Sequence, residues 1–135
     1  MCVFCDIVAG KIPSYKIFEN ETTYAFLDIA CDAYGHTLVI PKKHFENILD
    51  IDKVTLSDVM ETVQKVSKHY VEDCGFTGVN LINCTGKDAE QSVFHLHFHI
   101  IPRKENDNMK VYPNLIKKDL NLAEIQEKLN IRIRN

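Results

Sequence analysis

Short runs of hydrophobic residues, separated by turn-forming residues, make up most of the first 103 positions of the chain. Asn20 and Glu21 separate two β-prone runs, which is typical of a hairpin. Gly35 and Pro41 bracket a third run, which has the pattern of a buried strand. We therefore predict strands at residues 16–19, 23–27, 37–40, 79–82 and 94–101.

One long stretch has hydrophobic residues at the spacing of an amphipathic helix. Thr55 or Ser57 can cap its start, and Gly75 ends it. The helical repeat comprises Leu56, Val59, Met60, Val63, Val66, Tyr70 and Val71. A short helix is predicted after Asn121, whose spacing from Glu124 is that of a capping box. Helices between runs of strands, without βαβ alternation, indicate an α+β fold. We expect an antiparallel sheet of about five strands, one long helix and one or two short helices.

The composition is that of one soluble globular domain. The chain has 135 residues, of which 45% are hydrophobic and 26% charged. Its net charge is −3 and no basic run exceeds two residues, which argues against nucleic-acid binding. The longest apolar stretches are about five residues, whereas roughly 20 span a bilayer, so we expect no membrane segment. The N-terminus lacks a basic and an apolar leader region, so we expect a cytoplasmic protein whose cysteines are thiols or metal ligands.

Three histidines alternate with hydrophobic residues near the end of the strand-rich region. His95, His97 and His99 occupy every second position, so in a strand they share one face. The hydrophobic face is expected on the core, and the histidine face is expected in a cleft or at a metal. A catalytic zinc site is one alternative, although three ligands spread over about 13 Å of strand cannot all reach one ion. The other alternative is a strand whose three histidines face solvent.

The segment from His95 to Arg103 resembles the signature of the histidine triad (HIT) family, and in particular its Hint-like branch. The same order and spacing are matched at Phe4, Ile7, residues 25–29 and 35–44, Gly86, Gln91 and Ser92. The resemblance covers roughly residues 2–103. It predicts a HIT domain at residues 1–103, with residues 104–135 forming a tail of the same domain that contains a short helix.

This resemblance implies a hydrolase that cleaves purine nucleoside 5′-phosphoramidates at the P–N bond between AMP and an amine. His97, the middle histidine, would attack the α-phosphorus and form a covalent nucleotidyl-histidine, which water then cleaves. Imidazole suits this role because its neutral form is nucleophilic and predominates near pH 7. His99, the second residue implied to be catalytic, would surround the phosphate together with Gln91 and Ser92.

The resemblance also implies which residues hold the nucleoside. Asp28 would accept hydrogen bonds from the two ribose hydroxyls. The apolar slot for the base would be formed by Val3, Phe4, Phe26 and Ile29. Without the resemblance, Phe4, Phe26 and Ile29 are typical of a core, and Asp28 is typical of a strand end.

One departure from the family pattern concerns the residues that precede the histidines. The family has Asn-x-Gly where this chain has Cys84, Thr85 and Gly86. Asn83 lies one position early, and because successive strand residues face opposite sides, it can bind nucleotide only if the strand bulges. We retain Asn83 as a nucleotide-binding candidate on that condition.

Cys2 and Cys5 have the spacing of a zinc half-site. A redox CxxC motif is the alternative, but that motif is expected between a strand and a helix of a βαβ unit. The resemblance implies that His44 and His95 complete the site, as in zinc-containing bacterial members of the Hint-like branch. Four protein ligands leave no position for water, so the predicted zinc ion is structural.

Three other functions are compatible with the sequence. The protein could hydrolyse dinucleoside polyphosphates, bind nucleotide with negligible turnover, or use the histidines as ligands of a catalytic metal. The altered tripeptide before the histidines is the reason to retain the binding module. The family resemblance further implies a homodimer whose sheet continues across the interface.

Overall fold

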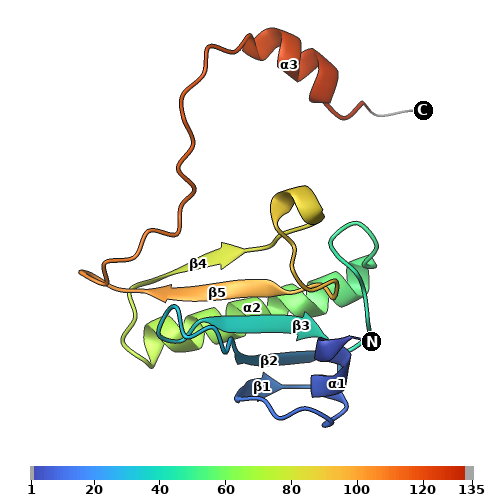
Figure 1. The fold of residues 1–135 in the computed structure, drawn as a ribbon, viewed down its shortest axis with the longest axis vertical. Helices are drawn as coiled ribbons and strands as arrows, with labels where there is room; N and C mark the ends of the chain where they lie inside the picture. The colour runs from blue at the N-terminus through green and yellow to red at the C-terminus, as the bar shows by residue number, and fades with distance from the viewer. Residues whose placement is uncertain (1, 133–135) are drawn as a thin grey trace.

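The computed structural model describes residues 2–132, which fold around one antiparallel sheet (Figure 1). The strand order is β1-β2-β3-β5-β4, and every neighbouring pair is antiparallel. The strands are β1 (Lys16–Glu19), β2 (Thr23–Leu27), β3 (Thr37–Pro41), β4 (Gly78–Ile82) and β5 (Phe98–Arg103). The helices are α1 (Val3–Val8), α2 (Lys53–Glu72), the 3₁₀ turn η1 (Lys87–Ala89) and α3 (Leu122–Leu129). The predicted α+β fold with a five-stranded antiparallel sheet is confirmed.

The two central strands β2 and β3 are buried on both faces. Alternate side chains of a strand point to opposite faces, so Ala25 and Val39 pack under α2 while Phe26 and Leu38 face α1. The face under α2 forms one core with Val59, Val63, Val66, Tyr70 and Ile100. The opposite face forms a second core with Phe4, Tyr24 and Ile40. The sheet therefore separates two hydrophobic cores, one under α2 and one under α1.

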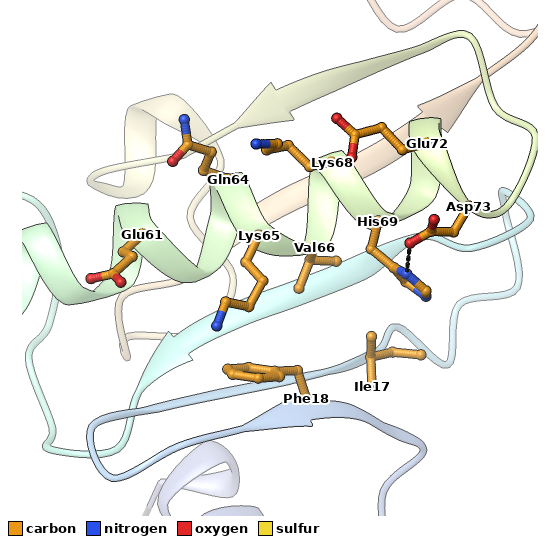
Figure 2. Close-up of a pocket in the computed structure, with 10 residues that line it drawn as sticks. All are labelled: Ile17, Phe18, Glu61, Gln64, Lys65, Val66, Lys68, His69, Glu72 and Asp73. Atoms are coloured by element: carbon orange, nitrogen blue, oxygen red, sulfur yellow. Dashed lines mark hydrogen bonds and ion pairs between the residues drawn. The ribbon is translucent and has the colours of Figure 1, made fainter.

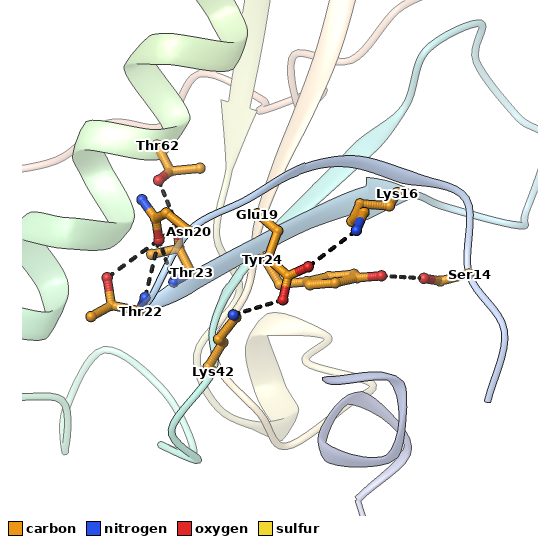
Figure 3. A network of polar contacts seen from close by, with 9 residues as sticks. All are labelled: Ser14, Lys16, Glu19, Asn20, Thr22, Thr23, Tyr24, Lys42 and Thr62. Atoms are coloured by element: carbon orange, nitrogen blue, oxygen red, sulfur yellow. Dashed lines mark hydrogen bonds and ion pairs between the residues drawn. The ribbon is translucent and has the colours of Figure 1, made fainter. Parts of the chain in front are cut away.

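A polar network ties the β1–β2 hairpin to the rest of the fold (Figure 3). The Asn20 side chain accepts hydrogen bonds from the backbone amides of Thr22 and Thr23, at 3.1 and 2.8 Å, and closes the turn. The buried hydroxyl of Thr23 lies 2.7 Å from that of Thr62 on α2. Buried hydroxyls need a partner, so this pair fixes the hairpin against the helix.

Helix α2 begins earlier than the sequence predicts. Asp52 is the N-cap, and its carboxylate accepts a hydrogen bond from the Thr55 amide at 3.0 Å. The prediction of a cap at Thr55 or Ser57 is therefore wrong by one turn. Asp and Thr are both good N-caps, so the sequence pattern alone did not distinguish Asp52 from Thr55 as the N-cap of α2.

The histidine segment is the main difference between the predicted and observed strands. We expected a strand from residue 94, but β5 begins at Phe98, so His95 and His97 precede it and only His99 lies within it. The hydrophobic face is also incomplete, because Phe94 is 47% exposed. Leu96 and Ile100 are buried as expected.

Beyond β5 the chain leaves the sheet and leads to α3, which stands apart from it (Figure 1). The Asn121 side chain accepts a hydrogen bond from the Glu124 amide at 3.2 Å, which confirms the predicted cap of this helix. No residue of α3 is buried. Among residues 2–132, no helix is both long and apolar enough to cross a membrane.

Candidate active site

The N-terminal segment forms a helix that the sequence did not predict. Cys2 caps α1, and its Sγ accepts a hydrogen bond from the Cys5 amide at 3.4 Å. One helical turn separates the two cysteines, so both thiols lie at the same end of α1. Phe4 between them is buried, and its ring packs against Phe26 with the centroids 5.5 Å apart. This hydrophobic contact positions the thiols over the sheet.

The structure brings together all four predicted metal ligands. The Nδ1 atoms of His44 and His95 are 3.2 Å apart, and His95 Nδ1 lies 3.3 Å from Cys2 Sγ and 3.5 Å from Cys5 Sγ. Cys5 Sγ lies 3.4 Å from His44 Nδ1. A tetrahedral zinc ion with ordinary bond lengths separates two nitrogens by about 3.3 Å and a nitrogen from a sulfur by about 3.6 Å. The cluster therefore has the size and the donor set of a zinc site.

A backbone carbonyl sets the orientation of His95. Its Nε2 donates to the carbonyl oxygen of Pro41 at 2.8 Å, so Nδ1 carries the lone pair that faces the thiols. Metal-binding histidines are commonly held in this way through their second nitrogen. The ring is fully buried, and this burial lowers the pKa of His95, which favours the neutral form that binds metal.

A backbone carbonyl also fixes the orientation of the His97 ring. Its Nδ1 donates to the carbonyl oxygen of His95 at 2.8 Å, which leaves the lone pair on Nε2. Burial lowers the pKa of His97, so the imidazole is neutral at physiological pH. The Phe4 ring packs edge-on against it, with the centroids 5.2 Å apart. The carbonyl of His97 accepts a hydrogen bond from Asn83 Nδ2 at 3.0 Å, which holds the backbone in place.

His99 is the end of a chain of hydrogen bonds. Its Nδ1 lies 2.9 Å from His36 Nε2, and His36 Nδ1 lies 2.7 Å from the Asp32 carboxylate. The carboxylate can only accept, so His36 donates from Nδ1; with His36 neutral, its Nε2 accepts, and His99 donates to it from Nδ1. The lone pair of His99 is therefore on Nε2. Burial is the largest cause that lowers the pKa of His99, to about 4, and the neighbouring imidazoles add to it.

A slot of about 320 Å³ lies on the α1 side of the sheet. Eight of the predicted site residues line it: Val3, Phe4, Phe26, Asp28, Ile29, Ser92, His97 and His99. Its walls also include residues that we did not predict, namely Ile7, Ile12, Pro13, Ser14, Leu27, Leu38 and Val93. Leu38 could have been found from strand alternation, because it shares a face with Ile40 and Phe26 is its partner across the sheet. The slot is largely apolar, with one carboxylate and two imidazoles.

Two predicted nucleotide-binding residues do not line the slot. The buried Gln91 amide is occupied by the backbone, since Oε1 accepts from the Gly86 amide at 2.9 Å and Nε2 donates to the Glu46 carbonyl at 2.7 Å. Asn83 binds the His97 carbonyl, as described above, and the Thr85 hydroxyl at 3.2 Å. In this structure both side chains hold the loops around the histidines.

Another hollow, of about 610 Å³, lies between α2 and β1 and contains none of the three alternating histidines (Figure 2). His69 lines it and pairs with Asp73 at 2.8 Å, and both side chains are exposed. Exposed pairs of this kind contribute little energy. This hollow is larger than the slot but offers no buried reactive group.

Comparison with known proteins gives the family. A model described as the HIT domain matches residues 9–106. The chain belongs to the HIT family. This HIT protein is 42% identical over 108 residues to adenosine 5′-monophosphoramidase HNT1 of Candida albicans, a match that covers 77% of the chain and 71% of the relative.

Solved structures agree with this fold. A HIT family protein from Bacillus subtilis superposes with a TM-score of 0.84 at 37% identity, covering 99% of this chain and 98% of that one. A zinc-bound histidine triad family protein from Mycobacterium smegmatis superposes with a TM-score of 0.77 at 37% identity, covering 82% and 80%. Both share the α+β fold of this HIT protein, and the second one holds zinc.

Proposed function

We propose that this HIT protein hydrolyses purine nucleoside 5′-phosphoramidates, cleaving the P–N bond between AMP and an amine through a covalent intermediate on His97. The observation that carries the proposal is the state of His97, which is buried, neutral and bonded through Nδ1, and which lines an apolar slot. The resemblance to a relative named as an adenosine 5′-monophosphoramidase supports the choice of substrate.

In the first step, His97 Nε2 attacks the α-phosphorus while the P–N bond breaks and its electron pair stays on the leaving nitrogen. That nitrogen needs a proton, and His99 Nε2 is the candidate donor. Without a bound anion, the low pKa of His99 keeps its imidazole neutral. The negative charge of a bound phosphate raises this pKa and favours the protonated form. In the second step, water attacks phosphorus, the P–Nε2 bond breaks, and His99 takes the proton from water.

The proposed zinc site is structural. Cys2, Cys5, His44 and His95 would hold the ion, and a shell of four protein ligands leaves no position for water. Zinc would supply a cross-link between the N-terminus, the segment after β3 and the segment before β5. It would also fix the backbone carbonyl of His95 that orients His97.

A mass measurement on the intact protein tests the proposed chemistry. When the protein is mixed with an AMP–amine conjugate and the reaction is quenched quickly, the mass of the intact chain should increase by that of one nucleotidyl group. Release of free amine without any adduct, under conditions that preserve P–N bonds to imidazole, would contradict covalent catalysis. Tight binding with neither adduct nor product would favour a nucleotide-binding module.

Asp28 should distinguish ribose from deoxyribose. It follows β2 at the rim of the slot, and one carboxylate oxygen is held by the Ala30 amide at 2.8 Å. We expect 2′-deoxy-AMP to bind more weakly than AMP by about 1.5–3 kcal/mol, the value of one hydrogen bond to a charged group. In Asp28→Ala the two affinities should become nearly equal, as measured by calorimetry. A variant that still discriminates as well as the parent would remove Asp28 from the ribose site.

Asp32 should support the protonated form of His99 through His36. The groups that face His99 are His97, His36, Asp28 and Asp32, with Lys110 in an adjoining cavity. The Asp32 charge raises the pKa of His99, so its loss in Asp32→Asn should leave less imidazolium to protonate the leaving amine.

We therefore expect Asp32→Asn to reduce kcat roughly tenfold and to move the alkaline limb of the pH profile to lower pH. AMP affinity and melting temperature should stay unchanged, because Asp32 is outside the slot. Asp32→Glu, which keeps the charge, is the matched control and should restore the profile. An unchanged alkaline limb in Asp32→Asn would show that the carboxylate does not act on His99.

We also propose a homodimer in which the sheet continues across the interface. Among the described strands, β4 is paired on one side only, with β5, and its Leu81 is 47% exposed. Such edges favour pairing with another chain. Analytical ultracentrifugation measures the mass in solution that tests this.

A further inference from the structure

Three side chains at one rim of the slot form a second group with the donors of a metal site. Asp28 follows β2, His36 precedes β3 and His99 lies in β5, so the group joins three segments. One ligand atom of each residue lies within 4.8 Å of the other two. His36 Nε2 lies 2.9 Å from His99 Nδ1 and 3.6 Å from the Asp28 carboxylate. Within residues 2–132, only this group and the proposed zinc site bring three or more such ligands together.

The separations between these atoms fit ligand positions around one ion. Two ligands with bonds of about 2.1 Å are about 3.0 Å apart at right angles and about 3.6 Å apart at an angle of about 120°. The distances from His36 to His99 and to Asp28 match these two values. Two imidazoles and one carboxylate are a common donor set for divalent transition metals, and three protein ligands leave other positions open.

Asp32 orients His36 for this role. Its carboxylate accepts a hydrogen bond from His36 Nδ1 at 2.7 Å, so the lone pair of His36 is on Nε2, the atom that faces the other two ligands. Metal-binding histidines commonly donate their other N–H to a carboxylate in this way. The His36 ring is buried, which limits its rotation. Metal binding would require the lone pair of His99 on Nδ1, with its hydrogen on Nε2.

The charges around the group also favour a cation. Asp28 and Asp32 contribute two carboxylates, and in the described part of the chain the ion-pair partner of each is His36. Lys110 lines the cavity next to Asp32, but among residues 2–132 it forms no ion pair with either carboxylate. Negative charge that no lysine or arginine neutralises raises the local concentration of cations.

We propose that Asp28, His36 and His99 form a second metal site, which binds a divalent transition-metal ion and excludes nucleotide while it is occupied. Asp28 and His99 line the slot, and the proposed function assigns them to the ribose and to the leaving amine. An ion bound to both would block these roles and leave His97 free. The inhibition rests on the proposed hydrolysis, whereas metal binding does not. Three ligands without a thiolate hold zinc less tightly than the proposed zinc site does, so we expect dialysis to empty the second site.

Calorimetry with Co²⁺ on the zinc-loaded parent protein tests this second site. Cobalt does not displace zinc from the first site, because zinc binds such ligands more tightly. We expect one Co²⁺ to bind per chain. AMP at ten times its own Kd should raise the Kd of cobalt about tenfold, after correction for cobalt bound by free AMP, because the two ligands compete. Added Co²⁺ should raise the KM of an AMP–amine conjugate without changing kcat.

Variants of His36 and its partner assign the cobalt to this group. His36→Ala should lose more than the roughly 10–100-fold in cobalt affinity that removal of an outer partner costs. Asp32→Asn should fall within that range, and Asp32→Glu, which keeps the carboxylate, should restore the affinity. His69→Ala is the matched control, because His69 also pairs with a carboxylate, that of Asp73 at 2.8 Å, but lies outside both metal groups. Its cobalt affinity should equal that of the parent.

A parent protein that binds no Co²⁺ beyond its zinc would overturn the site and leave the proposed hydrolysis in place. Cobalt affinity that is unchanged in both His36→Ala and Asp32→Asn would do the same. Cobalt binding that AMP does not weaken would overturn the exclusion of nucleotide. If Co²⁺ and AMP compete but the parent releases no amine from AMP conjugates, the metal site stands and the proposed hydrolysis is wrong.

Discussion

His97→Ala is expected to lose turnover of AMP–amine conjugates by at least about a thousandfold, because the variant has no group to form the covalent intermediate. AMP binding should persist, since the slot keeps its hydrophobic walls and Asp28. The adduct seen by intact mass with the parent protein should be absent. The parent and the variant should have similar circular dichroism spectra, because only one side chain contacted by Phe4 is removed.

His69→Ala is the matched control for this variant. His69 is an exposed histidine on α2, remote from the slot, and its partner Asp73 is exposed as well. We expect the parent rate and the parent adduct from it. If His97→Ala kept more than a few per cent of the rate, or if its adduct persisted, the nucleophile would be another residue. His99 would then be the first candidate, because its lone pair is also on Nε2.

The sequence was sufficient for most of the fold because local patterns coincide with the tertiary contacts. Residues 23–27 and 37–41 pair in register along their whole length, and the repeat at Val59, Val63 and Val66 is the buried face of α2. The predicted strand at residues 94–101 was wrong in its first half, because β5 begins at Phe98. The reason lies outside this segment. β3 pairs with β5 only at residues 37–39, and Pro41 has no amide hydrogen to extend the ladder. Leu96 bonds instead to the Phe45 carbonyl at 2.7 Å.

The candidate site was predictable in its residue types but not in its hydrogen bonds. The motif indicated which residues gather in the slot, and eight of them line it. The roles of Gln91 and Asn83 depend on carbonyl groups at Glu46 and His97, which no local pattern reveals. Asp32 was missed for the same reason, since its contact with His36 requires the loop after β2 to fold back on itself.

The largest effect on stability is expected from the cysteines of the proposed zinc site. Metal binding to ligands from separate segments contributes directly to the free energy of folding. We expect the parent to contain one zinc ion per chain by elemental analysis. Cys5→Ser should lose the ion and lower the melting temperature by roughly 10 °C. Cys74→Ser, an exposed cysteine outside the cluster, is the matched control and should change neither quantity.

The activity of Cys5→Ser distinguishes a structural zinc ion from a catalytic one. Four protein ligands leave no position for substrate or water, so Cys5→Ser should keep most of its rate wherever it remains folded. His95→Ala is a poorer test, because it removes a ligand and disturbs the residue whose carbonyl orients His97. Absence of metal from the parent protein would exclude the zinc site. A folded, metal-free Cys5→Ser without activity would instead assign the chemistry to the metal, and the role given to His97 would be withdrawn.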